Sequence, residues 1–177
     1  MHVADAIALI KNNVIPATGN WADLGCGSGL FTYALAHYLD TGSIIYALDK
    51  DKPSLSPLPN PHQVVIQPMQ VDFVKDDLPV SALTGILMAN SIHYVADKPA
   101  FIERIKPHLQ EKSFFLMVEY ETTRANPWVP YPVPFNALKT LFHQAGFTMA
   151  VKLGERPSVY QSGTMYAALF AKNAHSR

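Results

Sequence analysis

Three glycines stand at alternate positions behind an acidic residue in the segment Asp23-Leu24-Gly25-Cys26-Gly27-Ser28-Gly29. Glycine lets the backbone turn sharply and lets a ligand approach main-chain atoms that a side chain would cover. The residues before this segment have the pattern of a short strand, and residues 30–39 have the apolar spacing of a helix. In an open parallel sheet, ligands bind beyond the carboxyl ends of the strands, beside the unpaired N–H groups of the next helix. The sequence therefore predicts that residues 25–29, the glycine loop, form the floor of a cofactor pocket.

The spacing of these glycines separates two cofactor classes. The dinucleotide fingerprint G-x-G-x-x-G, counted from Gly25, needs a glycine where the chain has Leu30, which argues against an NAD(P)-dependent oxidoreductase. An acidic residue followed by three alternate glycines resembles the first motif, D/E-x-G-x-G-x-G, of the class I S-adenosylmethionine-dependent methyltransferases. The resemblance extends over nearly the whole chain in the order of its elements. It implies S-adenosylmethionine as cofactor, methyl transfer as reaction, and a role for Asp23 in holding the cofactor's ammonium group.

Polar residues also stand where the next three strands are expected to end. By the resemblance, the Asp49 carboxylate accepts hydrogen bonds from the ribose hydroxyls, and Asp72 accepts one from the adenine amino group while Phe73 lies against the ring. Asn90 is expected near the methionine end of the cofactor. Each acid alone is also explained as an ordinary strand-ending residue, but together these residues line one edge of a sheet. The predicted cofactor-binding residues are Asp23, Gly25, Cys26, Gly27, Gly29, Asp49, Lys50, Asp72, Phe73 and Asn90.

Candidate catalytic residues follow the fourth and fifth expected strands. An oxygen or nitrogen acceptor that starts protonated needs a base, and His93, whose side-chain type titrates near neutral pH, is the first candidate. Tyr94 beside it and Glu119 at the end of the fifth strand are the others, because a carboxylate there could position an amine. The alternatives are that His93 packs beside the cofactor or caps a turn, and that Glu119 belongs to a solvated loop. The only cysteine, Cys26, is predicted to pack rather than to react.

Residues 122–134 form a long loop, and such loops often carry function. Trp128 and Tyr131 are candidate walls of an acceptor pocket, and Arg124 is a candidate partner for an anionic group. The alternative is a proline-stiffened loop whose aromatic side chains only cover the sheet. The chain lacks the D/N-P-P-Y signature of DNA amino-methylating enzymes and any metal-ligand spacing, so no metal is expected. A small-molecule O or N acceptor is therefore predicted, and a non-catalytic binder of S-adenosylmethionine or S-adenosylhomocysteine acting in a complex is the alternative.

Strands and helices alternate along the chain, as expected for a mostly parallel sheet covered by helices. The predicted architecture is a three-layer Rossmann-like methyltransferase fold in one domain, residues 1–177, with seven strands and an antiparallel C-terminal strand. An N-terminal helix is expected within residues 1–16. Four prolines between residues 53 and 61, and Pro79, predict reduced crossover helices after strands two and three, because proline breaks a helix. The expected strands cover residues 21–24, 44–48, 64–72, 85–89, 114–118, 148–153 and 166–171, and the other helices residues 30–39, 99–109 and 135–145.

The charge balance bears on the expected partners. Fourteen basic and fourteen acidic side chains give a formal net charge of zero, whereas proteins that grip nucleic-acid phosphates usually have a basic excess. Neither nucleic acid nor an anionic membrane is therefore an expected partner. A single cysteine excludes an internal disulfide, and no run reaches the ~20 apolar residues of a membrane span. A cytoplasmic location is expected, and the sequence carries no signal for the oligomeric state.

Overall fold

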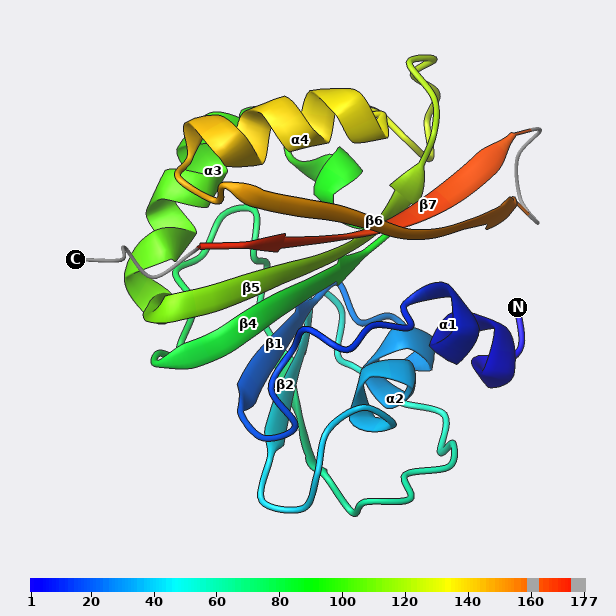
Figure 1. Ribbon diagram of the computed structural model, residues 1–177, viewed down its shortest axis with the longest axis vertical. Helices are drawn as coiled ribbons and strands as arrows, with labels where there is room; N and C mark the ends of the chain where they lie inside the picture. Colours follow the sequence, from blue (N-terminus) through cyan, green and yellow to red (C-terminus); the bar gives the residue numbers. More distant parts are fainter. Residues whose placement is uncertain (159–162, 173–177) are drawn as a thin grey trace.

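Seven strands form one sheet in the computed structural model, which describes residues 1–158 and 163–172 (Figure 1). The strand order is β3-β2-β1-β4-β5-β7-β6. Strands β1 to β5 run parallel, and β7 is antiparallel to both β5 and β6. This arrangement confirms the predicted mostly parallel sheet with an antiparallel C-terminal strand. The strands are β1 (Asn20–Leu24), β2 (Ile44–Asp49), β3 (Val65–Gln70), β4 (Leu83–Ala89), β5 (Leu109–Tyr120), β6 (Met149–Pro157) and β7 (Thr164–Ala171).

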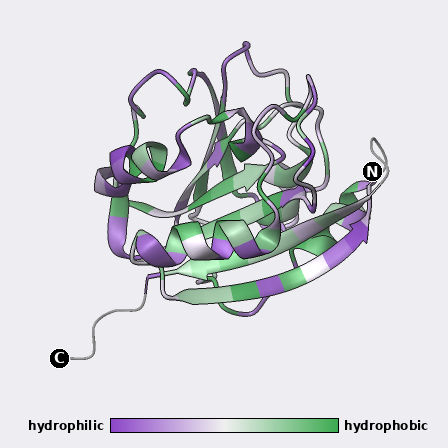
Figure 2. Ribbon diagram, turned by 90° about the horizontal axis from the view of Figure 1, so that it is seen from above, coloured by the Kyte–Doolittle hydropathy of each residue, from purple (hydrophilic) through white to green (hydrophobic). Residues whose placement is uncertain are grey.

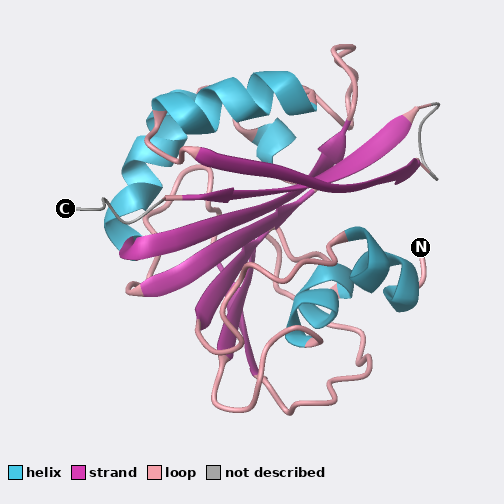
Figure 3. Ribbon diagram, in the orientation of Figure 1, coloured by secondary structure: helices cyan, strands magenta, loops and turns pink. Residues whose placement is uncertain are grey.

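Helices cover both faces of the sheet (Figure 3). Alternate residues of a strand point to opposite faces, so Phe115 and Met117 of β5 share a core with α3 and α4, whereas Leu116 and Val118 share one with α1 and α2. Both sets are buried, and the central strands are accordingly hydrophobic along much of their length (Figure 2). The helices are α1 (Val3–Leu9), α2 (Leu30–Ala36), α3 (Lys98–Ile105) and α4 (Phe135–Gln144), with short 3-10 turns η1 (Ile92–Tyr94) and η2 (Lys106–His108).

The N-terminal helix is shorter than the predicted span, and the prediction of a helix reaching residue 16 is wrong. α1 ends at Leu9, and the side chain of Asn12 folds the following residues into a turn. Its Oδ1 accepts hydrogen bonds from the N–H groups of Val14 and Ile15 at 3.1 Å, and its Nδ2 donates to the carbonyl of Ile10 at 3.0 Å. Short polar side chains compete with a helix for backbone groups in this way.

The connection between β2 and β3, residues 50–64, contains no helix. Its prolines remove the N–H groups that a helix would use. The segment lies against the glycine loop instead, where the N–H of Ser56 donates to the carbonyl of Ser28 at 3.0 Å. A side chain of the same segment, Leu55, lies 3.0 Å from the position that a Cβ on Gly29 would occupy. A non-helical strap therefore borders the glycine loop where a crossover helix would otherwise begin.

Residues 71–82, between β3 and β4, also lack a helix. Arg104 of α3 holds this connection by donating to the carbonyl oxygens of Phe73 at 2.7 Å and of Asp76 at 2.5 Å. The predicted reduction of both crossover helices is confirmed, and it goes further than expected because neither connection forms a helix.

The carboxyl ends of β1 to β5 meet at one edge of the sheet. The chain leaves β1 towards β2 on one side, and β4 lies on the other side of β1, so this edge contains a topological switch point. The glycine loop, Asp49, Asn90 and Glu119 all lie at this edge, after or at the ends of four strands. Among the described residues, no helix is long and apolar enough to cross a membrane.

Candidate functional site

The glycine loop turns sharply because it is bonded back to the neighbouring strand. The N–H groups of Gly25 and Cys26 both donate to the carbonyl of Leu48, at 2.8 and 3.0 Å. Gly25, Gly27 and Gly29 all have positive φ, a conformation that glycine adopts without strain. A Cβ on Gly25 would lie 2.7 Å from the Cβ of Ser91, whereas a Cβ on Gly27 would meet nothing within 4 Å. Glycine is therefore required at the first position by packing, and at the second it leaves bare backbone facing open space.

Two cavities lie at this edge of the sheet, and both are lined by Gly25 and Asn90. One has a volume of about 430 Å³ and lies on the β2–β3 side. The other, about 440 Å³, lies over the glycine loop and α2. Volumes of a few hundred Å³ are typical of small-molecule sites. The first is lined by Gly25, Asp49, Lys50, Asp72, Phe73, Val74, Lys75, Asn90, Ser91 and Tyr94, and the second by Met1, Asp23, Gly25, Cys26, Gly27, Ser28, Leu30, Phe31, Ser56, Leu58, Ala89 and Asn90.

The structure thus brings together nine of the ten predicted cofactor-binding residues around two adjoining cavities. Gly29 lines neither cavity and instead forms the amino-terminal cap of α2. Cys26 is buried, and burial, together with the charges of Asp23 and Asp49, raises the pKa of its thiol to about 12. A thiol with that pKa stays protonated at neutral pH, which agrees with a packing role rather than a nucleophilic one.

Asp23 is a buried acid at the floor of the second cavity. Its side chain is 1% exposed, and its Oδ2 accepts a hydrogen bond from the hydroxyl of Thr32 at 2.6 Å. Burial raises the pKa of Asp23 to about 7, although the Thr32 hydroxyl acts in the opposite direction and the charge of Asp49 adds to the rise. A buried carboxylate gains most from a nearby cation. The site therefore fits a positively charged group such as the ammonium of an amino acid.

Asp49 binds the glycine loop directly. Its Oδ2 accepts from the N–H of Gly27 at 2.9 Å, and its Oδ1 accepts from the N–H of Asp51 at 3.2 Å. A carboxylate has about four lone-pair sites, so two hydrogen bonds leave acceptor capacity for hydroxyl groups. Asp49 thereby orients the loop and can still accept from a ligand in the 430 Å³ cavity.

Asp72 and Phe73 occupy the far side of that cavity. Oδ1 of Asp72 accepts from the N–H of Val74 at 3.2 Å, and Oδ2 lies 3.3 Å from the ammonium of Lys75. Phe73 is 6% exposed and packs edge-on against Phe101, with ring centroids 5.9 Å apart. Only part of the Phe73 ring can therefore contact a ligand.

Asn90 has a strained backbone and an unsatisfied side chain. Its φ of 54° lies in the left-handed region, which is uncommon outside glycine. Its Oδ1 is buried and has no hydrogen-bond partner within the described residues, while its Nδ2 contacts the sulfur of Met165 at 3.7 Å. A buried acceptor without a partner costs about 1–3 kcal/mol. Because Asn90 lines both cavities, a donor on a bound ligand would relieve this cost.

Two predicted catalytic residues, His93 and Glu119, form a buried pair. Nδ1 of His93 lies 2.9 Å from Oε2 and 3.0 Å from Oε1 of Glu119, and the two side chains are 2% and 1% exposed. Within the described residues, Nε2 of His93 has no hydrogen-bond partner. Glu119 therefore lies in the sheet rather than in a solvated loop. Tyr94, 47% exposed, packs on the His93 ring and lines the 430 Å³ cavity, whereas His93 lines neither of the two cavities.

The sequence reasoning missed two buried polar side chains that support these residues. Thr32 orients Asp23, as described above, and Lys98 donates from Nζ to the carbonyls of Val95 and Tyr131 at 2.9 and 2.8 Å. Burial lowers the pKa of Lys98, while the charge of Glu119 acts in the opposite direction. A threonine on an amphipathic helix and a lysine in a helix's first turn resemble ordinary surface residues, so the sequence held no signal for either role.

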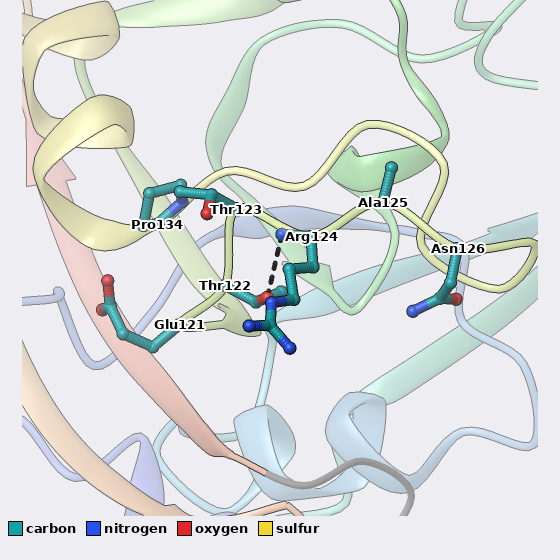
Figure 4. Close-up of a pocket in the computed structure, with 7 residues that line it drawn as sticks. All are labelled: Glu121, Thr122, Thr123, Arg124, Ala125, Asn126 and Pro134. Atoms are coloured by element: carbon teal, nitrogen blue, oxygen red, sulfur yellow. Dashed lines mark hydrogen bonds between the residues drawn. The ribbon is translucent and has the colours of Figure 1, made fainter.

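The predicted acceptor loop, residues 122–134, borders a third cavity of about 610 Å³ (Figure 4). Arg124 lines this cavity, but Trp128 and Tyr131 do not. Trp128 is 77% exposed, and Tyr131 is 47% exposed with its ring near the ammonium of Lys98, 5.8 Å from the ring centroid. The structure does not assemble the three side chains into one pocket. Groups of three or more metal-ligating side chains are also absent from the described part of the chain.

The fold and the site together define a class I S-adenosylmethionine-dependent methyltransferase. Residues 22–117, more than half of the chain, match the family model described as a methyltransferase domain. The chain belongs to this family of methyltransferase domains, which sets aside the oxidoreductase alternative. No curated protein matches the sequence.

Solved structures with the same fold include proteins named as methyltransferases. A SAM-dependent methyltransferase from Aquifex aeolicus has a TM-score of 0.62 and 14% identity, over 90% of this chain and 86% of that one. The Burkholderia thailandensis 1,6-didemethyltoxoflavin-N1-methyltransferase, solved with 1,6-didemethyltoxoflavin and S-adenosylhomocysteine, has a TM-score of 0.68 and 18% identity, over 97% and 78%. The YcgJ protein from Bacillus subtilis has a TM-score of 0.69 and 13% identity, over 97% and 99%. At these identities, the likeness shows a shared fold.

Proposed function

We propose that this protein transfers a methyl group from S-adenosylmethionine to an oxygen or nitrogen atom of a small molecule by in-line displacement. One observation carries the proposal: two cavities share Gly25 and Asn90 in their linings. One of them contains Asp49 and Asp72, and the other contains Asp23. An elongated ligand with a sugar and base at one end and a cationic amino acid at the other fits this distribution of acids. S-adenosylmethionine supplies a methyl group on a positively charged sulfur, which makes the carbon electrophilic.

The chain's own residues then have separate tasks. Asp49 and Asp72 would hold the adenosyl part, and Asp23 would hold the ammonium group, with the Thr32 hydroxyl fixing the carboxylate at 2.6 Å. Asn90 would accept a hydrogen bond at Oδ1, which has no partner among the described residues. In-line transfer depends mainly on holding the acceptor, the methyl carbon and the sulfur in line, so these contacts act chiefly by positioning.

His93 is the proposed base. In the tautomer that donates Nδ1–H to the Glu119 carboxylate, 2.9 Å away, Nε2 carries the lone pair. As the acceptor's oxygen or nitrogen bonds to the methyl carbon, its O–H or N–H bond breaks and the proton passes to Nε2, so the imidazolium that forms is stabilised by the Glu119 carboxylate. Glu119 is thus a positioning residue, and its burial at 1% exposure strengthens its hold on the ring.

Cofactor binding and turnover are tested separately. Isothermal titration of the wild type with S-adenosylmethionine is expected to give one site per chain, and Asp49→Ala is expected to bind it more weakly. Pools of small hydroxyl and amine compounds are then screened for S-adenosylhomocysteine release, with His93→Gln as the matched variant. A wild type that does not bind S-adenosylmethionine would overturn the proposal.

A second candidate is a non-catalytic binder that acts in a complex. It is supported by the edge strand β3, where the missing crossover helix leaves Val65 47% exposed. Tight S-adenosylmethionine binding without S-adenosylhomocysteine release across broad pools would favour this candidate over the methyltransferase.

A further inference from the structure

The 610 Å³ cavity is built almost wholly by one continuous segment. Residues 121–126 and Pro134 line it, at the point where β5 ends (Figure 4). Figure 4 shows that the side chains of Glu121 and Arg124 leave the segment in different directions. Hydroxyl and amide groups of Thr122, Thr123 and Asn126 complete the polar part of the lining, so the cavity offers hydrogen-bond donors beside a guanidinium.

The guanidinium of Arg124 is the one cationic group that the described residues contribute to the lining of this cavity. Within the described residues, its guanidinium forms no ion pair and no hydrogen bond. The acidic residue of the same cavity, Glu121, has other partners: its Oε2 lies 3.7 Å from the ammonium of Lys152, which also pairs with Glu155, and its carboxylate accepts from the N–H of Phe135 at 3.3 Å. The guanidinium of Arg124 is therefore free to pair with an anion in the cavity that it lines.

The segment that carries Arg124 is held in place before any ligand arrives. The N–H of Arg124 donates to Oγ1 of Thr122 at 3.1 Å, and Oδ1 of Asn126 accepts from the N–H groups of Trp128 and Val129 at 2.9 and 3.0 Å. These local bonds fix the backbone on both sides of Arg124. A preorganised loop loses less entropy when a ligand binds.

The far half of the loop is bonded to the proposed catalytic segment. The N–H of Tyr131 donates to the carbonyl of His93 at 3.0 Å, and Nζ of Lys98 donates to the carbonyl of Tyr131 at 2.8 Å. The hydroxyl of Tyr166 donates to the carbonyl of Val133 at 2.7 Å. The near half of the loop follows β5, whose last residue, Tyr120, is the neighbour of Glu119, the partner of His93. The cavity and the proposed base therefore belong to one connected unit at the same edge of the sheet.

We propose that this cavity binds an oxyanion of the methyl acceptor, a carboxylate or a phosphate, through the guanidinium of Arg124 with help from the hydroxyls of Thr122 and Thr123. The planar fork of arginine pairs with two oxygens of such a group at once. This inference rests on the proposed methyl transfer for the identity of the ligand as an acceptor, but the anion site itself can be measured without turnover.

The first experiment measures the anion site directly. The Nε–H resonance of Arg124, assigned by its loss in Arg124→Gln, is followed by ¹H–¹⁵N NMR as sodium acetate or inorganic phosphate replaces chloride at constant ionic strength. We expect a saturable shift of this resonance. Arg104 is the internal control, because its guanidinium is bonded to the carbonyls of Phe73, Val74 and Asp76, and its resonance should stay constant. A shift of Arg124 that is absent, or no larger than that of Arg104, would overturn the inference.

The second experiment measures turnover on matched pairs of acceptors. Each pair consists of an anionic compound and its neutral amide or alcohol counterpart, and carboxylates and phosphates are tested as separate sets. We expect the anionic members to be preferred, and Arg124→Gln to lower their kcat/KM about tenfold through KM while changing that of the neutral members less than twofold. Arg124→Lys keeps the charge but loses the planar fork, so its kcat/KM on the anionic acceptors should lie between those of the wild type and Arg124→Gln. Preference for neutral acceptors, or unchanged kinetics in Arg124→Gln, would refute the anion site and leave methyl transfer standing. A saturable NMR shift with no turnover of any acceptor would refute the proposed function and leave the anion site standing.

Discussion

Asp23→Asn isolates the effect of the buried charge beneath the 440 Å³ cavity. Burial holds the pKa of the Asp23 carboxyl at about 7, against 3.8 for an exposed aspartate. Asparagine has nearly the same shape, is never charged, and offers a carbonyl oxygen to the Thr32 hydroxyl, which now lies 2.6 Å from Oδ2. The substitution therefore removes the titration while keeping most of the packing.

The sign of the pH dependence of stability follows from the folded-state and unfolded-state pKa values of Asp23. The folded-state pKa lies above the unfolded one, so the stability contribution is complete below about pH 3.8 and is lost as the pH rises to about 7. A shift of about three units corresponds to about 4 kcal/mol at 1.36 kcal/mol per unit. The free energy of unfolding of Asp23→Asn, minus that of the wild type, should therefore grow by about 1.4 kcal/mol per pH unit between about pH 4 and 7 and then level off.

Urea unfolding of both proteins between pH 4 and 8, without ligand, measures this difference. Asp77→Asn is the control, because it makes the same substitution at a side chain that is 87% exposed. A difference between Asp23→Asn and the wild type that does not change with pH would refute the reasoning. The charge of Asp23 should also affect cofactor affinity, because its carboxyl must lose a proton to hold the ammonium group. The wild-type Kd for S-adenosylmethionine should therefore rise about tenfold for each pH unit that the pH falls below about 7.

Four further substitutions test three separate parts of the structure. Gly85→Ala would place a Cβ 2.4 Å from the Trp21 ring, so urea unfolding should show a loss of about 1–3 kcal/mol; an unchanged midpoint would contradict the packing. Gly27→Ala meets no atom within 4 Å but has a φ of 52°, so it should lose about 1–2 kcal/mol of stability while S-adenosylmethionine affinity, measured by calorimetry, falls as well; unchanged affinity would mean that the loop does not face the cofactor. His93→Gln should lower kcat on an identified acceptor about 100-fold and Glu119→Gln by less, both with cofactor affinity retained; a full kcat in His93→Gln would exclude it as the base.

The order and type of the elements were predictable because the signals are local. The run from Ile44 to Leu48 is apolar and became a strand that is largely buried, and the prolines of residues 50–64 excluded a helix there. The error in the length of the N-terminal helix also has a local cause. Apolar spacing continues to Val14, but the side chain of Asn12 captured two backbone N–H groups and ended the helix after Leu9.

The site could be predicted only in outline. Alternate glycines and strand-ending acids identified the residues around the cofactor cavities, because the end of every parallel strand falls on one edge of the sheet. The burial of those residues could not be foreseen. Asp49 accepts from the N–H of Gly27, and Oδ1 of Asn90 is buried with no partner among the described residues. Neither could be predicted, because both depend on side-chain rotamers that packing sets.

The sequence by itself determined the strands, the glycine loop and the family, since each depends on backbone constraints that act over a few residues. Only the tertiary structure decided which charges meet. It joined His93 to Glu119 across 26 residues and set Thr32 against Asp23. It also left the guanidinium of Arg124 without a charged partner in the part of the chain that the structure describes. Such pairings depend on how the whole sheet packs, because many dihedral angles together decide which side chains meet. The energy of a charged group also depends on how far residues distant in the sequence exclude water from it.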